Sequence, residues 1–338
     1  MKKIFFILLA LVLALSLSLM GCTTEGQQEE EEEEEEEFPT RPITLVCGYA
    51  AGGGSDLWTR TAAEAMQDFV DVPVNVLNVE GSGGLVAGDY VINSANPDGY
   101  TIWLIESHPM NNLAKGLEGP DMRDSSVVTL LGAMTDYSYY LFSRADSPYD
   151  TLGALVEAAE AAPGEIVIGT ASLAGAYSCI AHFMQDASGA EFNIIPYGSV
   201  APMWVELLAG RISVGVGAYS EVKPYLGEDV PLDERVQLLA MASPARVDVT
   251  PDCPTFQELG YDVEWGTYFG MAVSAETPEY IVEYLNETFY AMAHDPDFRD
   301  DLAEIGRLGY EYVTPEDLVE LADYYYNKTK SLVDAGVI

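Results

Sequence analysis

Three consecutive glycines, Gly52–Gly54, separate an apolar run from an amphipathic segment in a pattern that suits anion binding. The run Ile43–Val46 is apolar and partly β-branched, which predicts a buried strand, and Ser55 or Asp56 is placed to cap the helix that follows. That helix would bury one apolar face, formed by Leu57, Ala62, Ala65, Met66 and Phe69. Glycine permits positive φ and close approach of a ligand, and a helix N-terminus presents unpaired N–H groups. The stretch therefore predicts either an anion-binding loop or a tight turn of an α/β domain.

Motifs for nucleotides, catalysis and metals are missing from the sequence. No Gly-Lys-Ser/Thr closes the glycine loop and the G-x-G-x-x-G spacing is absent, so a nucleotide is not expected. The nucleophile-elbow pattern G-x-S-x-G fails, because Leu173 follows the run from Gly169 to Ser172, and there is no H-E-x-x-H. The histidines are isolated and no C-x-x-C occurs, so neither a metal nor a cofactor is expected. A hydrolase remains only a remote alternative.

Strand-like and helix-like segments alternate after the first glycine loop. Pro73–Leu77 alternates as a strand, Gly81–Gly84 forms a second glycine turn, and Leu85–Ala95 suits a short helix. Further along the chain, Leu152–Ala161 and Tyr177–Ala187 have helical patterns. This alternation predicts a largely parallel sheet, in which ligands bind beyond the carboxyl ends of the strands. Both glycine turns fall at such ends.

The N-terminus has the features of an export signal. A basic start at Lys2 and Lys3 precedes the apolar run Ile4–Leu19, which is too short for a comfortable membrane span. The sequence Leu19-Met20-Gly21-Cys22 resembles a bacterial lipobox, which implies cleavage before Cys22 and lipid on its sulfur; an ordinary secretory signal is the alternative. We expect a signal peptide over residues 1–21 and an acidic, disordered tether over 22–39, containing Glu29–Glu37. The mature protein would be extracytoplasmic and lipid-anchored.

The charge of the chain excludes some partners. Its 55 acidic and 15 basic residues give a formal net charge of −40. Such a charge repels nucleic acid and anionic membrane surfaces, so neither is expected to bind the folded part. It suits a protein exposed to high salt outside the cell, where salt screens the self-repulsion.

A series of short motifs, in order along the chain, resembles the tripartite tricarboxylate transporter receptor family, whose members are also called Bug-type extracytoplasmic solute receptors. The matching residues are Arg41–Thr44, Ala50–Asp56, Arg60, Asn78, Gly81–Gly84, Pro97–Thr101, Ile195–Gly198, Leu207, Leu208, Gly210, Pro254, Thr255, Glu258, Gly260, Tyr261 and Thr277–Glu279. Gly48 departs from the family pattern, where proline is common, and Val79-Glu80 stands where Arg-Pro is expected. The likeness covers nearly all of residues 39–338.

The resemblance implies a fold and a function. The fold is an α/β periplasmic-binding-protein clamshell of type II-like topology, with two lobes joined by two crossing hinge strands. Lobe 1 would comprise residues 40–138 and 244–338, and lobe 2 residues 139–243, with crossings near Tyr139–Ser143 and Leu238–Ala242. The protein would be a monomeric, non-enzymatic receptor that delivers a small organic carboxylate to the membrane subunits of a tripartite transporter. A ligand-sensing module for a membrane sensor kinase is the alternative, and the sequence does not separate the two.

The resemblance also implies ligand-binding positions in four loops. In the first lobe they are Tyr49, Ala51, Gly52, Gly53, Ser55, Asp56, Gly81, Ser82 and Gly83. In the second lobe they are Ser172, Gly175, Ala176, Tyr177, Ser178, Pro196, Tyr197 and Gly198. Asp56 could orient an amino or hydroxyl group of the ligand, or it could instead pair with Arg60 four positions on. We also expect Gly53 to need positive φ and close ligand approach.

Basic residues are sparse around these loops. No Lys or Arg occurs between Arg60 and Lys115, or between Arg144 and Arg211. All of the loops except the first lie within those two gaps. We therefore expect neutral donors and helix N-termini to hold the anion, which suits a carboxylate better than a highly charged phosphate.

Overall fold

The computed structural model describes residues 37–171, 175–308 and 310–338. The expected signal peptide, Cys22, most of the tether and Ser172 lie outside these described residues. The chain divides into Met1–Glu37 and a compact unit, Phe38–Ile338. That unit begins in a packed position, because the ring of Phe38 contacts the rings of Tyr100 and Tyr284 edge-on. Within the described ranges, no helix is both long and apolar enough to cross a membrane.

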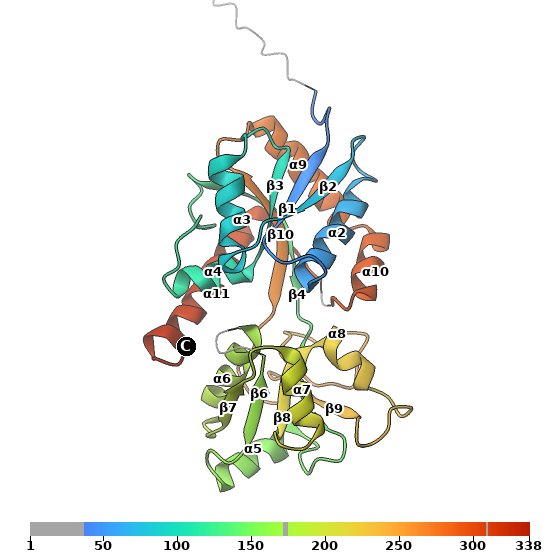
Figure 1. Cartoon of the computed structure of the whole chain (residues 1–338), viewed down its shortest axis with the longest axis vertical. Coiled ribbons are helices and arrows are strands. Elements are labelled where there is room, and N and C mark those ends of the chain that lie inside the picture. The colour runs from blue at the N-terminus through green and yellow to red at the C-terminus, as the bar shows by residue number, and fades with distance from the viewer. Residues whose placement is uncertain (1–36, 172–174, 309) are drawn as a thin grey trace, which may run out of the picture. The chain divides into compact units, whose positions relative to one another are not determined.

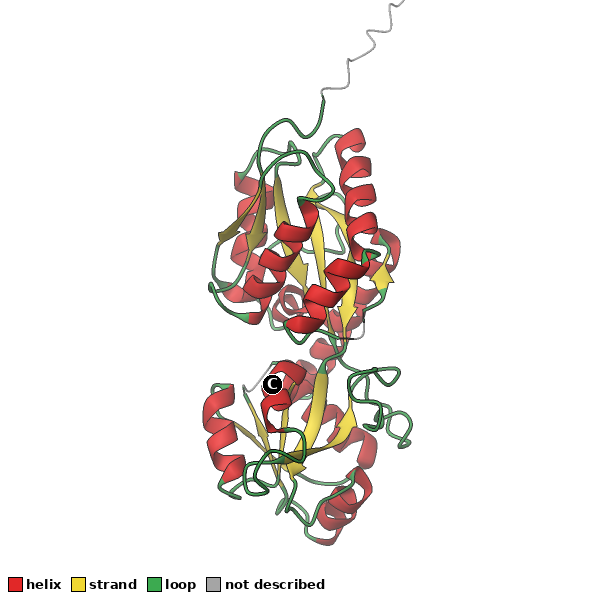
Figure 2. Ribbon diagram, turned by 90° about the vertical axis from the view of Figure 1, so that its right-hand side faces the viewer, coloured by secondary structure: helices red, strands yellow, loops and turns green. Residues whose placement is uncertain are grey.

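The compact unit contains two β-sheets covered by helices (Figures 1 and 2). The elements before the first change of sheet are β1 (Ile43–Cys47), α2 (Gly54–Met66), β2 (Val74–Asn78), η1 (Ser82–Gly84), α3 (Leu85–Asp89), η2 (Tyr90–Ser94), β3 (Thr101–Glu106), α4 (Ser107–Ala114) and β4 (Val128–Asp136). The elements of the second sheet and its helices are β5 (Tyr139–Arg144), α5 (Leu152–Ala161), β6 (Val167–Thr170), α6 (Ala176–Ser188), β7 (Asn193–Pro196), α7 (Val200–Leu208), β8 (Val214–Ala218), α8 (Tyr219–Val222), η3 (Lys223–Tyr225) and β9 (Val236–Met241). The chain then returns through β10 (Thr267–Ser274), α9 (Glu279–Ala293), α10 (Pro296–Glu304), β11 (Tyr312–Val313) and α11 (Pro315–Asp334).

Both sheets are mixed, which corrects the expectation of a largely parallel sheet. The first has the strand order β11-β4-β10-β3-β1-β2, and the second β7-β6-β8-β5-β9. The alternating segments do pair in parallel, with Ile43 opposite Val74 and Ile168 opposite Ile194. The strands at the changes of sheet pair antiparallel: β10 lies between β3 and β4, and β5 lies between β8 and β9. Two residues separate β4 from β5, so the chain passes directly from the first sheet to the second, with no helix between the two strands.

Alternating side chains bury both faces of the first sheet, as expected for a sheet between two helix layers. On β3, Ile102 and Leu104 face one apolar cluster, and Trp103 and Ile105 face the other. Helices α2, α9 and α10 supply the first cluster, and α3, α4 and α11 the second. On α2 the buried face is formed by Asp56, Trp58, Thr59, Ala62, Ala63 and Met66. Leu57, expected in that face, is 43% exposed, and the fully buried Trp58 stacks on Phe269 instead.

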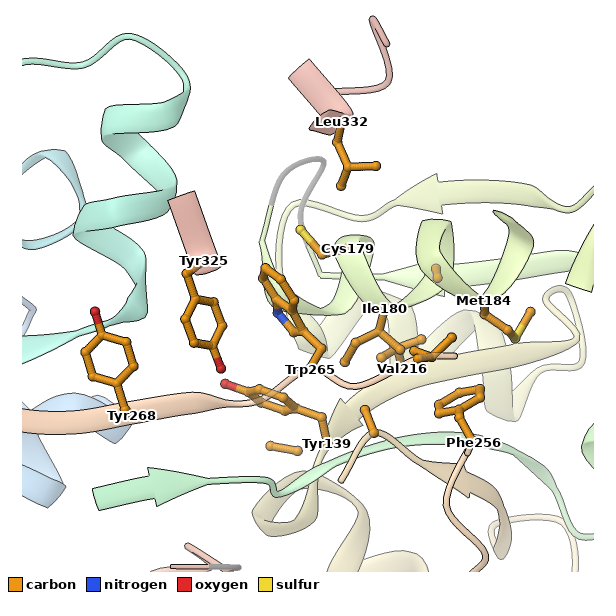
Figure 3. Close-up of a cluster of buried hydrophobic side chains, with 14 of the residues drawn as sticks. Tyr139, Cys179, Ile180, Met184, Val216, Phe256, Trp265, Tyr268, Tyr325 and Leu332 are labelled. Atoms are coloured by element: carbon orange, nitrogen blue, oxygen red, sulfur yellow. The ribbon is translucent and has the colours of Figure 1, made fainter. Parts of the chain in front are cut away.

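One apolar cluster extends across both sheets. Figure 3 shows Tyr139 of β5, Ile180 of α6 and Tyr268 of β10 in the same group of buried side chains. Trp265 lies in the segment between β9 and β10, and the centroid of its ring is 4.9 Å from the ring centroid of Tyr325 in α11. Buried side chains therefore fix the positions of β5 and β10 where these two strands lie close to the connections between the sheets.

Candidate ligand pocket

A pocket of about 360 Å³ is lined by residues of both sheets and their helices. The predicted residues that line it are Ser55, Gly175, Ala176 and Tyr177. Gly54, from the predicted glycine loop, also lines it. The lining residues that were not expected from the sequence are Glu106, His108, Tyr139, Ala171, Ala218, Ser220, Glu221, Phe269 and Arg307. A second hollow, of about 450 Å³, contains none of the predicted residues and is lined by Tyr137, residues 243–249, Arg299, Ala303, Arg307, Leu308, Tyr310 and Glu311. We take the smaller pocket as the site, because only it joins two helix N-termini.

The helices α2 and α6 both begin at the pocket. Their N-cap residues are Gly53 and Gly175, and glycine has no side chain to cap the first turn. This corrects the expectation that Ser55 or Asp56 caps α2. The first N–H groups of both helices remain as donors, and each helix adds a partial positive charge at its N-terminus. The pocket can therefore bind an anionic group from two sides.

The conformation of the first glycine loop differs from expectation at one position. Gly52 has the positive φ of +81°, whereas Gly53 is extended at φ −77°. The close approach occurs at Gly54, where an added Cβ would collide with the guanidinium of Arg307. Ala51, Gly52 and Gly53 are exposed and do not line the pocket, so ligand contact by these three residues stays a prediction.

Asp56 supports the loop from inside. Its side chain is 1% exposed and accepts hydrogen bonds from the Gly52 N–H, the Arg60 Nε and the Asn78 Nδ2, each at 2.8 Å. Burial alone would raise the pKa of Asp56, but these donors more than offset it and hold the pKa below its usual range. The pairing with Arg60 is thus present, and the carboxylate is occupied within the protein. A role for Asp56 in orienting the ligand is untested.

The second glycine turn packs against the first loop and does not line the pocket. Gly81, Ser82 and Gly83 all have positive φ. The hydroxyl of Tyr49 donates to the Gly83 carbonyl at 2.9 Å. A Cβ on Gly48 would lie 2.5 Å from the Cα of Gly84, so glycine at position 48 permits this contact between the two loops.

The other positions predicted from the second lobe lie away from the pocket lining. Ser178 is 1% exposed, and its hydroxyl has no hydrogen-bond partner within the described part of the chain. Pro196 and Gly198 are exposed, and Tyr197 packs against the cluster that contains Met203. Their contact with a ligand stays a prediction.

The presence of Arg307 in the pocket is the largest difference between the site expected from the sequence and the site in the structure. Its side chain is 14% exposed, its Nη1 donates to Asp136 at 2.9 Å, and its guanidinium lies over the ring of Phe269. Burial would lower the pKa of Arg307, but Asp136, Tyr139 and Glu106 more than offset it, and the net shift is upward. The guanidinium is therefore charged, and among the described residues its one hydrogen bond is the bond from Nη1 to Asp136. The tertiary fold thus brings a distant arginine into a pocket where only neutral donors and helix N-termini were expected, and which of these groups hold an anion stays a prediction.

Two carboxylates face the same pocket. Glu106, at the end of β3, is 2% exposed, and its Oε2 lies 2.6 Å from the Nδ1 of His108. Glu221 accepts bonds from the Ala218 N–H at 3.0 Å and the Tyr177 hydroxyl at 2.9 Å. Burial raises the pKa of Glu221, although these two donors and Arg307 oppose the shift. Glu106 had a signal in the sequence, because it is a polar residue that ends a strand, where ligands bind in such sheets.

Comparison with known proteins identifies the family. The profile described as "Tripartite tricarboxylate transporter family receptor" matches residues 58–336. The chain belongs to this family. This receptor is 29% identical to the protein BugT of Bordetella pertussis over 265 residues, which cover 76% of this chain and 78% of BugT.

Solved structures confirm the expected two-lobed binding-protein fold. A TctC solute-binding protein from Polaromonas, solved without ligand, matches with a TM-score of 0.76 and 27% identity, over 88% of this receptor and 100% of that chain. The periplasmic binding protein BugD matches with a TM-score of 0.66 and 26% identity, over 89% of this receptor and 99% of that chain.

Proposed function

We propose that this receptor captures a small organic carboxylate outside the cytoplasm and passes it to the membrane subunits of a tripartite tricarboxylate-type transporter. The observation that supports this most is the meeting of the α2 and α6 N-termini around the buried guanidinium of Arg307. A carboxylate there would accept charge-assisted hydrogen bonds, each stabilising by about 1.5–3 kcal/mol. The protein would bind as a monomer, without catalysis or a cofactor.

We also propose the lobe boundaries given by the family resemblance, residues 40–138 with 244–338 and residues 139–243. The two changes of sheet, between β4 and β5 and between β9 and β10, support two hinge connections. The pocket draws its lining from both sides of these connections. Ligand binding would draw the two lobes together through small rotations at the hinge.

A panel of carboxylic acids tests the function. Mono-, di- and tricarboxylates at millimolar concentration are screened by thermal shift, each beside its neutral amide. A ligand at one hundred times its Kd stabilises the folded state by about 2.7 kcal/mol, so an acid that binds should raise Tm by several degrees and its amide should not. If no acid shifts a cooperative transition, or if amides act equally well, the receptor does not recognise carboxylates here.

Membrane attachment through Cys22 is a further part of the proposal, and it rests on the lipobox-like Leu19–Cys22. Cys22→Ser removes the sulfur that would carry lipid, so the variant should leave the membrane fraction for the soluble one. Fractionation of expressing cells followed by detection of the receptor measures this. Undiminished membrane partitioning of the serine variant would contradict lipid anchoring and favour an ordinary secretory signal.

A further inference from the structure

A small aromatic cavity lies beside α11, at the two connections between the sheets. Its volume is about 140 Å³, and it shares no lining residue with the candidate ligand pocket. Most of the lining is aromatic: Tyr137 from the β4–β5 connection, Trp265 from the segment before β10, and Tyr324 and Tyr325 from α11. Tyr324 is 37% exposed, so the lining reaches the surface. A cavity of about 150 Å³ can hold benzene, so this one has room for a small organic group.

The rings stand at large angles to one another, as the walls of a cage do. The centroids of Trp265 and Tyr325 are 4.9 Å apart with their planes at 69° (Figure 3), and those of Tyr324 and Tyr325 are 5.5 Å apart at 87°. A Cβ on Gly266 would lie 2.7 Å from the Tyr137 ring, so glycine permits that ring to pack here. The face of an aromatic ring is electron-rich, and several rings around one space attract a cation.

Glu264 adds a formal negative charge to the cavity wall. Its Oε1 accepts a hydrogen bond from the Tyr137 hydroxyl at 3.2 Å, and its Oε2 accepts one from the Gln257 Nε2 at 3.0 Å. Both donors are neutral, and none of the described residues that line the cavity is basic. Burial raises the pKa of Tyr324 to about 12, with Glu264 adding to the shift, so this phenol stays neutral at physiological pH. The cavity thus offers a carboxylate and neutral rings, and no positive charge.

A cation of the protein already lies beside this cage. The Nζ of Lys328, one helical turn after Tyr324, is 5.5 Å from the centroid of the Tyr324 ring and 5.4 Å from that of Phe183. These are cation–π distances. Lys328 does not line the cavity, so its charge occupies the neighbourhood of the cage without filling it.

We propose that this cavity binds a small quaternary ammonium compound, with its methylated head against the rings of Trp265, Tyr324 and Tyr325 and with Glu264 as the counter-charge. A quaternary head has no N–H group to satisfy and is weakly hydrated, so it loses little on entering an aromatic wall. A metal ion would lose its water and find few oxygen ligands here. The site is separate from the carboxylate pocket, and the inference does not depend on the proposed function.

Choline and its neutral isostere 3,3-dimethylbutan-1-ol test the charge of the ligand. Each is titrated into the receptor by calorimetry at constant ionic strength, and the two differ only in the nitrogen that carries the charge. Choline should bind roughly 10-fold or more tighter than the alcohol, because the attraction to the rings and to Glu264 needs a cation. Glu264→Gln keeps the size of the side chain, removes its charge, and should remove most of that difference.

Variants of α11 test the location of the site. Tyr324→Leu removes a ring at a partly exposed position and should weaken choline binding roughly 10-fold, whereas Tyr324→Phe keeps the ring and should bind as the parent does. Lys328→Gln removes a competing positive charge and should tighten binding. The matched control is Tyr290→Leu, which changes an exposed tyrosine of α9 outside the cavity and should have no effect. Far-UV spectra establish that each variant is folded.

Three results would overturn the inference. If choline does not bind the folded receptor, the cavity is a packing gap only. If the neutral alcohol binds as tightly as choline, the cavity does not select a cation. If folded Glu264→Gln and Tyr324→Leu both bind choline as the parent does, the cation binds elsewhere on the receptor.

Discussion

Arg307→Leu should abolish carboxylate binding and also destabilise the fold. Loss of the guanidinium removes up to two charge-assisted hydrogen bonds to the ligand, each worth about 1.5–3 kcal/mol, so affinity should fall roughly 100-fold or more. The substitution also leaves Asp136, which is 0% exposed, without its charged partner. Breaking a buried ion pair in this way costs about 3–5 kcal/mol. Calorimetric titration and urea unfolding measure the two effects.

A double variant separates the loss of ligand binding from the loss of fold stability. Arg307→Leu combined with Asp136→Asn removes both charges and keeps the oxygen that accepts from the Ser138 N–H. The pair should recover much of the lost stability, because no uncompensated charge stays buried, and still fail to bind. Arg41→Leu changes an exposed arginine paired with Asp98 and should leave binding intact. Full affinity of the refolded double variant would show that Arg307 does not contact the ligand.

Gly54→Ala should weaken ligand binding while leaving the receptor folded. The new Cβ would collide with the Arg307 guanidinium at the first residue of α2, so the arginine must move away from the helix N-terminus. A carboxylate could then no longer contact the guanidinium and the first N–H groups of α2 together. Loss of one charge-assisted hydrogen bond predicts an affinity at least 10-fold lower, measured by calorimetry on protein with a normal far-UV spectrum.

The matched control is Gly153→Ala, in the first turn of α5. Nothing lies within 4 Å of the Cβ that this substitution adds, and alanine suits a helix better than glycine. Affinity should be unchanged and stability equal or slightly higher. If Gly54→Ala binds like Gly153→Ala, the close approach of α2 to Arg307 has no part in recognition.

The family and the local elements were predictable from the sequence. The helix Leu152–Ala161 has the predicted ends, and the strand predicted over Ile43–Val46 extends by one residue to Cys47. These elements depend on apolar periodicity and stop signals within a few residues, which do not change with the rest of the fold. The order of weak motifs likewise predicted the two-lobed fold that the solved structures confirm.

One predicted loop from each lobe lies at the pocket, but the sequence did not indicate which residues of these loops line it. Ser55 and Gly175–Tyr177 line the pocket. Their loops could be identified from the sequence because a helix N-terminus behind a glycine turn has a recognisable local pattern. Gly53 was expected to have positive φ, and Gly52 has it, because the turn is shaped by the Asp56 carboxylate from the following helix. Leu57 was expected in the core of α2, but packing against Phe269 selected Trp58.

What the sequence by itself determined was the class of protein, the succession of helices and strands, and the glycine loops that end beside the pocket. What only the tertiary structure decided was the charge of the site. Arg307 follows Arg60 by nearly the whole length of the fold, and no spacing rule connects it with Glu106, Asp136 or Glu221. These groups come together because β10 inserts between β3 and β4 and because β4 passes directly into the second sheet. Long-range strand pairing determines which charges become neighbours, and local sequence patterns contain no information about it.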